Sequence, residues 1–205
     1  GDHDGAIKDY TKGIELDPKY MKVWNNRGVA KMEKGDKDGA IEDLNRAIEL
    51  DPDNFVLRRD LGVVYRRLNL TDEAMESYQK ALEINPRDGV LRLNLGSLYR
   101  SQGDFENAAH ELEFAVQYAP TLTEAQIAFG EISQELGRNK EAIRAYEAAI
   151  EINPNLAAQP YLNLGNLYLV DGNLDRSEWA YRKFLDRWKG EKALREQALI
   201  RLKII

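Results

Sequence analysis

Five of the six prolines in this 205-residue chain recur at a constant spacing of 34 residues. The members of this series are Pro18, Pro52, Pro86, Pro120 and Pro154, and only Pro160 lies outside it. A fixed period of this length is the signature of a repeat protein, in which each unit packs on its neighbours in the chain. The chain is therefore expected to be built from stacked copies of one small unit.

Two further series of residues follow the same period. The first consists of glycines, Gly28, Gly62, Gly96, Gly130 and Gly165. The second consists of small residues, Ala6, Ala40, Ala74, Ala108, Ala142 and Ser177. Both series take one extra residue at their last step, which indicates a single insertion between Pro154 and Gly165. Small side chains at these places predict two segments whose backbones approach each other closely.

Each repeat has the pattern of two helices, as residues 55–88 illustrate. Apolar residues recur at helical spacing over 57–68 and again over 74–82, and the intervening Thr71 is predicted to cap the second helix. The helix should end at Asn85, because a residue that precedes proline avoids the helical conformation. The turn between the two helices falls on residues that tolerate a left-handed conformation, Gly35, Asn69, Gly103, Gly137 and Gly172.

Residues 61–86 show the pattern Leu-Gly…Tyr…Ala…Tyr…Ala…Pro, which resembles the tetratricopeptide repeat (TPR). The segment from Trp24 through Gly28 and Ala40 to Pro52 resembles the same repeat. The resemblance implies an all-α fold, a right-handed α-solenoid of antiparallel helix hairpins that forms a TPR-like superhelix. It also implies a protein or peptide partner that lies in the concave groove of this superhelix.

The period divides residues 1–205 into a single TPR-like array. It consists of a half repeat at 1–20, full repeats at 21–54, 55–88, 89–122, 123–156 and 158–191, and a closing helix at 192–205, twelve helices in all. A closing helix needs a polar outer face, predicted to consist of Arg195, Gln197, Arg201 and Lys203. The alternative is that the chain stops inside a longer array. The apolar stripe of the half repeat, which includes Ile7 and Tyr10, lacks a hairpin partner, so we expect self-association there or upstream chain to cover it.

Composition argues against several other classes of function. The chain has 29 basic and 35 acidic residues, a net charge of −6, which disfavours nucleic acid as a partner. It has no cysteine, and its two histidines stand apart, so no catalytic set, no metal site and no cofactor are predicted. No apolar run approaches the roughly 18 residues of a membrane span, which argues against membrane insertion. Residues 36–39 resemble a calcium loop only superficially; because residues 2–5 repeat the pattern, both are interpreted as helix caps.

In a TPR-like superhelix the first helix of each repeat lines the concave groove. These helices are net basic in the first three repeats and net acidic in the last two. The helical frame selects the side chains expected to face the groove: Lys22, Asn25, Asn26, Arg59, Arg66, Asn94, Ser97, Arg100, Glu124, Glu131, Asn163 and Asn166. A groove with this charge distribution would orient a peptide that is acidic toward the N-terminal repeats and basic toward the C-terminal ones.

Arginines and asparagines are the two signals within this set. Arg59, Arg66 and Arg100 form a candidate anion site, unless they pair with neighbouring acids such as Asp60. Asn26, Asn94 and Asn163 share one place in their repeats, where their amides could bind the backbone of an extended peptide. This row resembles the asparagine ladder in the superhelical domain of O-GlcNAc transferase, although Asp60 and Ala128 interrupt it.

The sequence thus predicts a protein–protein interaction scaffold that binds an extended peptide segment and is not itself an enzyme. The alternative is the substrate-recognition arm of a larger enzyme, such as a glycosyltransferase, whose catalytic domain lies outside this chain.

Overall fold

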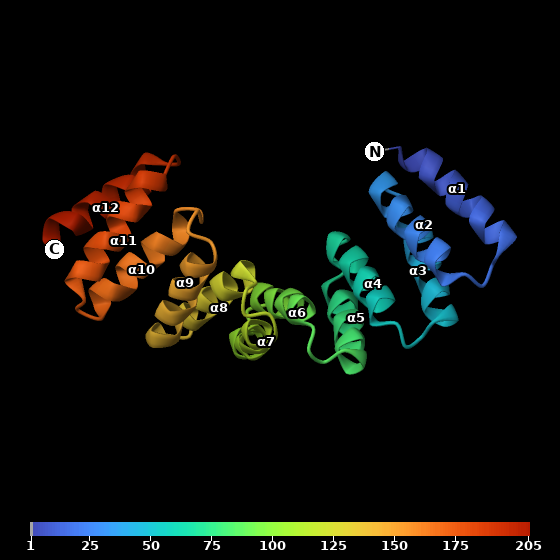
Figure 1. Ribbon diagram of the computed structural model, residues 1–205, viewed down its shortest axis with the longest axis horizontal. Helices are drawn as coiled ribbons and strands as arrows, with labels where there is room; N and C mark the ends of the chain where they lie inside the picture. The colour runs from blue at the N-terminus through green and yellow to red at the C-terminus, as the bar shows by residue number, and fades with distance from the viewer. Residues whose placement is uncertain (1) are drawn as a thin grey trace. The chain divides into compact units, whose positions relative to one another are not determined.

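The computed structural model describes residues 2–205, and this part of the chain contains twelve α-helices and no strand (Figure 1). The helices are α1 (His3–Leu16), α2 (Met21–Lys34), α3 (Lys37–Leu50), α4 (Phe55–Arg67), α5 (Thr71–Ile84), α6 (Gly89–Ser101), α7 (Phe105–Tyr118), α8 (Thr123–Glu135), α9 (Asn139–Ile152), α10 (Gln159–Val170), α11 (Leu174–Arg187) and α12 (Lys192–Ile204). The expected all-α fold is confirmed.

Successive helices pack as antiparallel hairpins, which Figure 1 shows as paired coils joined by short turns. α2 packs on α3, α4 on α5, α8 on α9 and α10 on α11. Contacts of α1 with α2 and of α3 with α4 continue the stack near the N-terminus, and contacts of α9 with α10 and of α11 with α12 do so near the C-terminus. This neighbour-to-neighbour packing confirms the α-solenoid.

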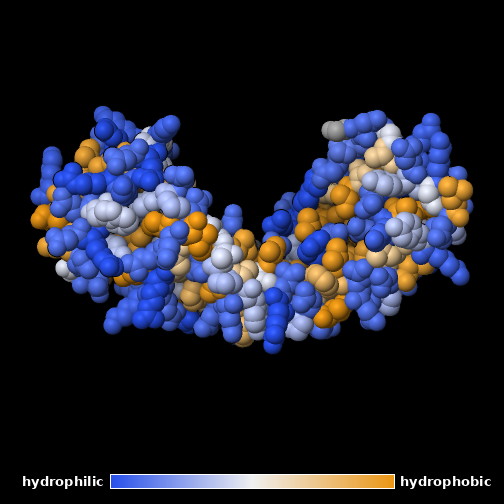
Figure 2. All heavy atoms as spheres, in the orientation of Figure 1, coloured by the Kyte–Doolittle hydropathy of each residue, from blue (hydrophilic) through white to orange (hydrophobic). Residues whose placement is uncertain are grey.

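The chain divides into two compact units. The N-terminal unit ends at Leu98 and the C-terminal unit begins at Tyr99, so the division falls near the end of α6. In the N-terminal unit, Leu44 of α3 and Leu61 of α4 belong to one buried cluster. In the C-terminal unit, Tyr146 of α9 and Leu164 of α10 do the same. In Figure 2, apolar patches interrupt a mainly hydrophilic surface in both units.

The turns inside the hairpins have the conformation expected from their sequence. Asn69 is the one residue other than glycine with a positive φ in the described chain, at 59°, and Gly35 has a φ of 93°. Gly103, Gly137 and Gly172 also lie in this left-handed region.

Helix caps agree with the sequence at most positions. Asp36 Oδ1 accepts a hydrogen bond from the Gly39 N–H at 3.1 Å, as expected for a cap rather than a calcium loop. The prediction for Thr71 is wrong, because Thr71 is the first residue of α5 and Leu70 occupies the cap position. The Leu70 N–H donates to the Tyr65 carbonyl at 3.0 Å, which places the end of the turn one residue earlier.

In each of the five first helices of the hairpins, a side chain near the start of the helix donates a hydrogen bond to the carbonyl of the preceding periodic proline. Trp24 Nε1 donates to Pro18 at 2.9 Å, and Arg92 Nε donates to Pro86 at 2.9 Å. Arg58, Gln126 and Tyr161 make the same contact with Pro52, Pro120 and Pro154. Different side chains thus perform one structural role at the joint between repeats.

Candidate functional site

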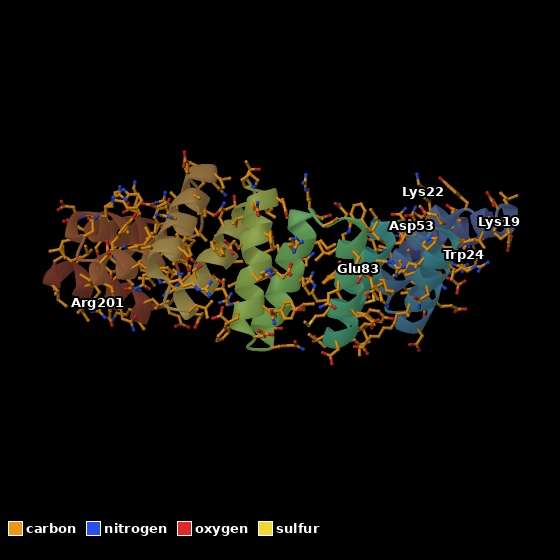
Figure 3. All side chains as sticks on the ribbon, turned by 90° about the horizontal axis from the view of Figure 1, so that it is seen from below. Lys19, Lys22, Trp24, Asp53, Glu83 and Arg201 are labelled. Carbon is orange, nitrogen blue, oxygen red and sulfur yellow. The ribbon has the colours of Figure 1, made fainter. Side chains whose placement is uncertain are left out.

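All twelve predicted groove residues lie on the first helices of the hairpins, and each is half-buried or exposed. α2 carries Lys22, Asn25 and Asn26, α4 carries Arg59 and Arg66, α6 carries Asn94, Ser97 and Arg100, α8 carries Glu124 and Glu131, and α10 carries Asn163 and Asn166. Figure 3 shows Lys22 extending from α2 away from the ribbon.

In the N-terminal unit a carboxylate joins the polar side chains of α2 and α4. Asn25 Nδ2 donates to Asp60 Oδ2 at 3.1 Å, and Arg59 donates to Asp60 Oδ1 through Nε at 3.1 Å and Nη2 at 2.9 Å. Arg59 therefore has the partner that the sequence offered as the alternative to an anion site.

A buried tyrosine lies close to this cluster. Tyr78 of α5 is fully buried, and its hydroxyl has no hydrogen-bond partner among residues 2–205. The same is true of the buried Asn25 Oδ1. Burial raises the pKa of Tyr78, while the positive charges of Arg66 and Arg59 act in the opposite direction. The cluster thus contains two buried polar atoms whose hydrogen-bonding capacity is unused.

Two cations of α2 that the sequence counts as part of the basic layer are engaged inside a hairpin. Arg27 donates to both oxygens of Asp43 at 2.7 and 2.8 Å, and the Lys31 ammonium lies 3.0 Å from the same carboxylate. Asp43 is 1% exposed. The hydrogen bond between Arg27 and Asp43 raises the pKa of Arg27, although burial of the guanidinium opposes this shift. Sequence reasoning missed this cluster, which pairs two of the positive charges counted for α2 with a buried carboxylate.

Some of the other basic residues of the N-terminal unit form ion pairs with acidic side chains, and some do not. Arg67 of α4 forms an ion pair with Glu33 of α2. Lys22 and Arg66 are exposed and have no ion-pair partner in the described part of the chain. Among the basic side chains predicted to face the groove, Lys22 and Arg66 are therefore the two whose positive charge is not paired with an acid of the described chain.

In the C-terminal unit, polar side chains from α6, α8, α9 and α10 surround a cavity of about 230 Å³. Its walls consist of Arg100, Glu131, Gln134, Glu135, Tyr146, Gln159 and Asn163. The structure thus brings together three of the predicted groove residues. Arg100 Nη1 and Glu131 Oε2 form an ion pair across the walls, so Arg100 also has an acidic neighbour.

Hydrogen bonds connect the neutral side chains of this cavity. Asn163 Nδ2 donates to the Tyr146 hydroxyl at 2.9 Å, and that hydroxyl donates to Gln134 Oε1 at 3.4 Å. Gln159 Nε2 donates to Asn163 Oδ1 at 3.0 Å. Burial raises the pKa of Tyr146 to about 12, although the hydrogen bond from Asn163 favours ionisation. The cavity therefore offers neutral donors and acceptors beside the Arg100–Glu131 ion pair and the carboxylate of Glu135.

Tyrosines recur at one place in the second helix of the hairpin and face the periodic glycine of the first. A Cβ built on Gly62 would lie 2.5 Å from Tyr78 Cε1, and one on Gly130 would lie 2.8 Å from Tyr146 Cε1. Tyr181 packs on Gly165 in the same way, and its hydroxyl donates to Asn166 Oδ1 at 2.7 Å. The sequence placed Tyr78 in an apolar stripe and in the repeat motif, without a role beside the glycine. The signal that could have identified these tyrosines is their register with the glycines.

The asparagine row is not uniform in its contacts. Asn163 bonds within its own unit, whereas the amides of Asn26 and Asn94 have no side-chain hydrogen bond among the described residues. Ser97 Oγ donates to the Leu93 carbonyl of its own helix at 2.8 Å. The peptide-binding ladder stays a prediction.

All four polar side chains predicted for the outer face of the closing helix α12 are exposed. Gln197 and Arg201 also line a cavity of about 660 Å³ together with residues of α10 and α11. They lie one helical turn apart and therefore share one side of α12. Figure 3 places Arg201 at the C-terminal end of the chain.

No described helix combines the length and the apolar character needed to cross a membrane. Residues 2–205 contain no cluster of three or more histidine, cysteine or acidic side chains able to hold a metal ion.

This arrangement of hairpins can be compared with models of known protein families. Models described as tetratricopeptide repeat match residues 22–54, 59–88 and 77–110, and one described as TPR repeat matches 1–35 and 130–172. The chain belongs to the tetratricopeptide repeat family. The fold and family are those of protein-interaction scaffolds. A search of curated proteins found no match.

Solved structures with the same fold cover most of the chain. A MamA protein is 26% identical over 82% of this chain and 91% of its own, with a TM-score of 0.72. YrrB, described as a TPR protein with an unusual peptide-binding site, is 24% identical over 93% of this chain and 97% of its own, with a TM-score of 0.77. PilF from Pseudomonas aeruginosa is 21% identical over the whole chain and 86% of its own, with a TM-score of 0.71.

Proposed function

We propose that this protein is a non-catalytic scaffold that binds an extended segment of a partner protein on the first helices of its hairpins. The observation that carries the proposal is the cavity of about 230 Å³ between α6, α8, α9 and α10, with its linked asparagine, glutamine and tyrosine side chains.

The chemistry of this cavity suits a peptide backbone. Each peptide unit offers one donor and one acceptor, and the amides of Gln159 and Asn163 carry both kinds of group. Tyr146 stays neutral at physiological pH because its pKa is about 12, so its hydroxyl adds no charge to the cavity. Arg100 and Glu131 can also exchange their mutual contact for charged side chains of a partner.

The size of the cavity argues in the same direction. Sites for whole small molecules and cofactors have volumes of roughly 300–1,000 Å³. A volume of about 230 Å³ is below that range and suits one or two side chains of a longer segment.

In the N-terminal unit, Lys22 and Arg66 give the proposed binding surface an accessible positive charge. Arg59 would contribute as well if an acidic residue of the partner replaced Asp60. We therefore assign acidic residues of the partner to this unit, where charge complementarity accelerates association and sets specificity.

An exchange of charges tests the site without removing its ion pair. The double variant Arg100→Glu/Glu131→Arg keeps an opposite-charge pair but reverses the pattern offered to a partner. A matched control exchanges Glu106 and Arg138, which form a 2.7 Å ion pair between α7 and the start of α9. Both variants and the wild type would be used for affinity capture from cells of the source organism, with the captured proteins quantified by mass spectrometry.

The proposal expects one set of proteins that the wild type and the Glu106/Arg138 control capture equally and that the Arg100/Glu131 variant loses. Identical capture by all three proteins would contradict the assignment of the site.

A further inference from the structure

The cavity of about 660 Å³ in the C-terminal unit has a role that the proposed binding surface does not explain. Its lining combines apolar side chains from α10 and α12 with a few polar groups. Leu162, Leu169 and Val170 come from α10, and Ile200 comes from α12. Val170 is 75% exposed and Ile200 is 56% exposed, so apolar surface is open to solvent here.

The polar groups of this cavity favour a negatively charged occupant. Arg201 lines the cavity, and no acidic side chain of the described chain forms an ion pair with it. The lining contains no aspartate or glutamate. A guanidinium group that stands beside apolar surface binds a carboxylate through two parallel hydrogen bonds.

Asn166 adds hydrogen-bond donors to the same cavity. The Tyr181 hydroxyl donates to Asn166 Oδ1 at 2.7 Å, and this contact directs the amide oxygen toward the buried tyrosine. The NH₂ group of Asn166 has no partner among the described residues, so its two donors are available. Arg201 and Asn166 thus present donors from two helices.

α10 connects this cavity with the smaller one. Asn163 lines the smaller cavity, and Asn166 lines the larger one. Residues three apart on a helix lie on the same side, on adjacent turns. A segment bound at Asn163 can therefore continue across α10 to Asn166.

We propose that the cavity between α10, α11 and α12 binds a bulky apolar side chain of the partner segment together with the carboxylate of an adjacent aspartate or glutamate. The apolar side chain packs on Leu162, Leu169 and Ile200, and the carboxylate pairs with Arg201. The inference rests on the proposed function, because the occupant belongs to the same extended segment. It adds a specificity-determining subsite to that function.

A capped hexapeptide, acetyl-Gly-Ser-Leu-Glu-Ser-Gly-amide, is a suitable probe. Titration of this peptide into the isotope-labelled protein, up to the millimolar range, would be monitored by backbone amide NMR signals. The subsite predicts saturable shifts in α10 and α12. The Arg201→Gln variant should bind the peptide roughly tenfold more weakly, the factor expected for a lost charged hydrogen bond.

Two controls separate the charge pair from general effects. Arg195→Gln changes an exposed arginine of the same helix that does not line the cavity, and it should leave binding unchanged. Replacing the peptide's glutamate by glutamine should weaken binding to the wild type by the same factor. In the Arg201→Gln variant, the same replacement in the peptide should cause no further loss of affinity.

The outcomes distinguish this inference from the proposed function. Shifts confined to α8 and to the part of α10 near Asn163 would overturn the subsite and leave the proposed function standing. The subsite is also refuted if Arg195→Gln and Arg201→Gln bind equally well. An absence of shifts throughout the protein would contradict both.

Discussion

At the residue scale, Asp43 shows how one repeat can solve a packing problem differently from the next. Its buried carboxylate holds Arg27 and Lys31 between α2 and α3. The corresponding places of the following repeat contain Leu61, Tyr65 and Ser77, which carry no charge. Removing one partner of a buried ion pair is costly, whereas replacing the whole group by well-packed neutral residues is often tolerated.

Asp43→Ala should therefore lower the free energy of unfolding by about 3 kcal/mol, because two cations lose their buried partner. The triple variant Arg27→Leu/Lys31→Tyr/Asp43→Ser should stay close to the wild type. Urea unfolding monitored by circular dichroism measures both. A wild-type stability for Asp43→Ala would show that the cations find water or another acid at no cost.

Because the pKa of Tyr146 is raised, we expect the free energy of unfolding to depend on pH in the alkaline range. Its native pKa of about 12 lies above the ordinary tyrosine value of about 10, chiefly because of burial. Between these values the unfolded chain has released a proton that the folded protein keeps, so stability falls as pH rises from about 10 to about 12. Below about pH 10, Tyr146 is protonated in both states, so its contribution to the free energy of unfolding does not change with pH.

The Tyr146→Phe variant should show a shallower fall of the urea midpoint over that window, because its residue 146 does not ionise. Urea titrations at several pH values measure the slope for both proteins. Tyr168, whose pKa burial also raises to about 12, remains in the variant and serves as the internal reference. Equal slopes for the two proteins would mean that Tyr146 titrates normally.

At the element scale, the sequence predicts the helices well because their ends depend on local backbone chemistry. Asn69 and Gly35 end first helices through a left-handed residue, and a proline follows the end of each of the first five second helices of the repeats. Thr71 shows the limit of such signals, since a polar residue is assigned to the cap only to within one position.

The candidate site was harder to predict from sequence. The 34-residue period identifies equivalent positions, but a long side chain chooses its partner in three dimensions. Arg59 bonds to its own neighbour Asp60, whereas Arg100 reaches Glu131 on another helix. The hydroxyl of Tyr146 reaches the amide of Asn163 on α10, a connection that apolar periodicity does not reveal.

α1 should be the least protected helix of the N-terminal unit. It contains no buried residue, whereas α5 buries five. Few buried contacts permit local opening, so the amides of α1 should exchange with deuterium faster than those of α5 in dilute solution. Hydrogen-exchange mass spectrometry at several protein concentrations would measure this.

The predicted self-association through α1 adds a second expectation to that experiment. Protection of α1 should increase with concentration if a neighbouring copy covers its apolar stripe. A monomer with a well-protected α1 would refute both the local opening and the need for a covering partner.

At the scale of the whole molecule, stability is distributed along the chain. Each hairpin packs on its sequence neighbours, and the described chain divides into two compact units. In such proteins the free energy of folding is approximately a sum of contributions from repeats and from the interfaces between neighbours. A local defect should therefore remain local.

Gly62→Ala tests this expectation. Its new Cβ would lie 2.5 Å from the ring of the buried Tyr78, and overpacking of this kind costs about 1–3 kcal/mol. Hydrogen exchange should accelerate in α4 and α5 and stay unchanged in α8–α11. Gly130→Ala, which crowds Tyr146 in the C-terminal unit, should give the reverse pattern. Uniform acceleration in both variants would indicate a single cooperative unit.

The hydrogen bonds to the proline carbonyls have a consequence for how such an array can diverge. The equivalent proline carbonyls of different repeats accept a hydrogen bond from an indole, a guanidinium, an amide or a phenol. The contact at this joint therefore depends on the reach and donor capacity of the side chain and not on residue identity. Charge at the joint can consequently vary from neutral at Trp24 to positive at Arg92 while the connection persists. The electrostatic character of each repeat can thus adapt to a new partner independently of the scaffold.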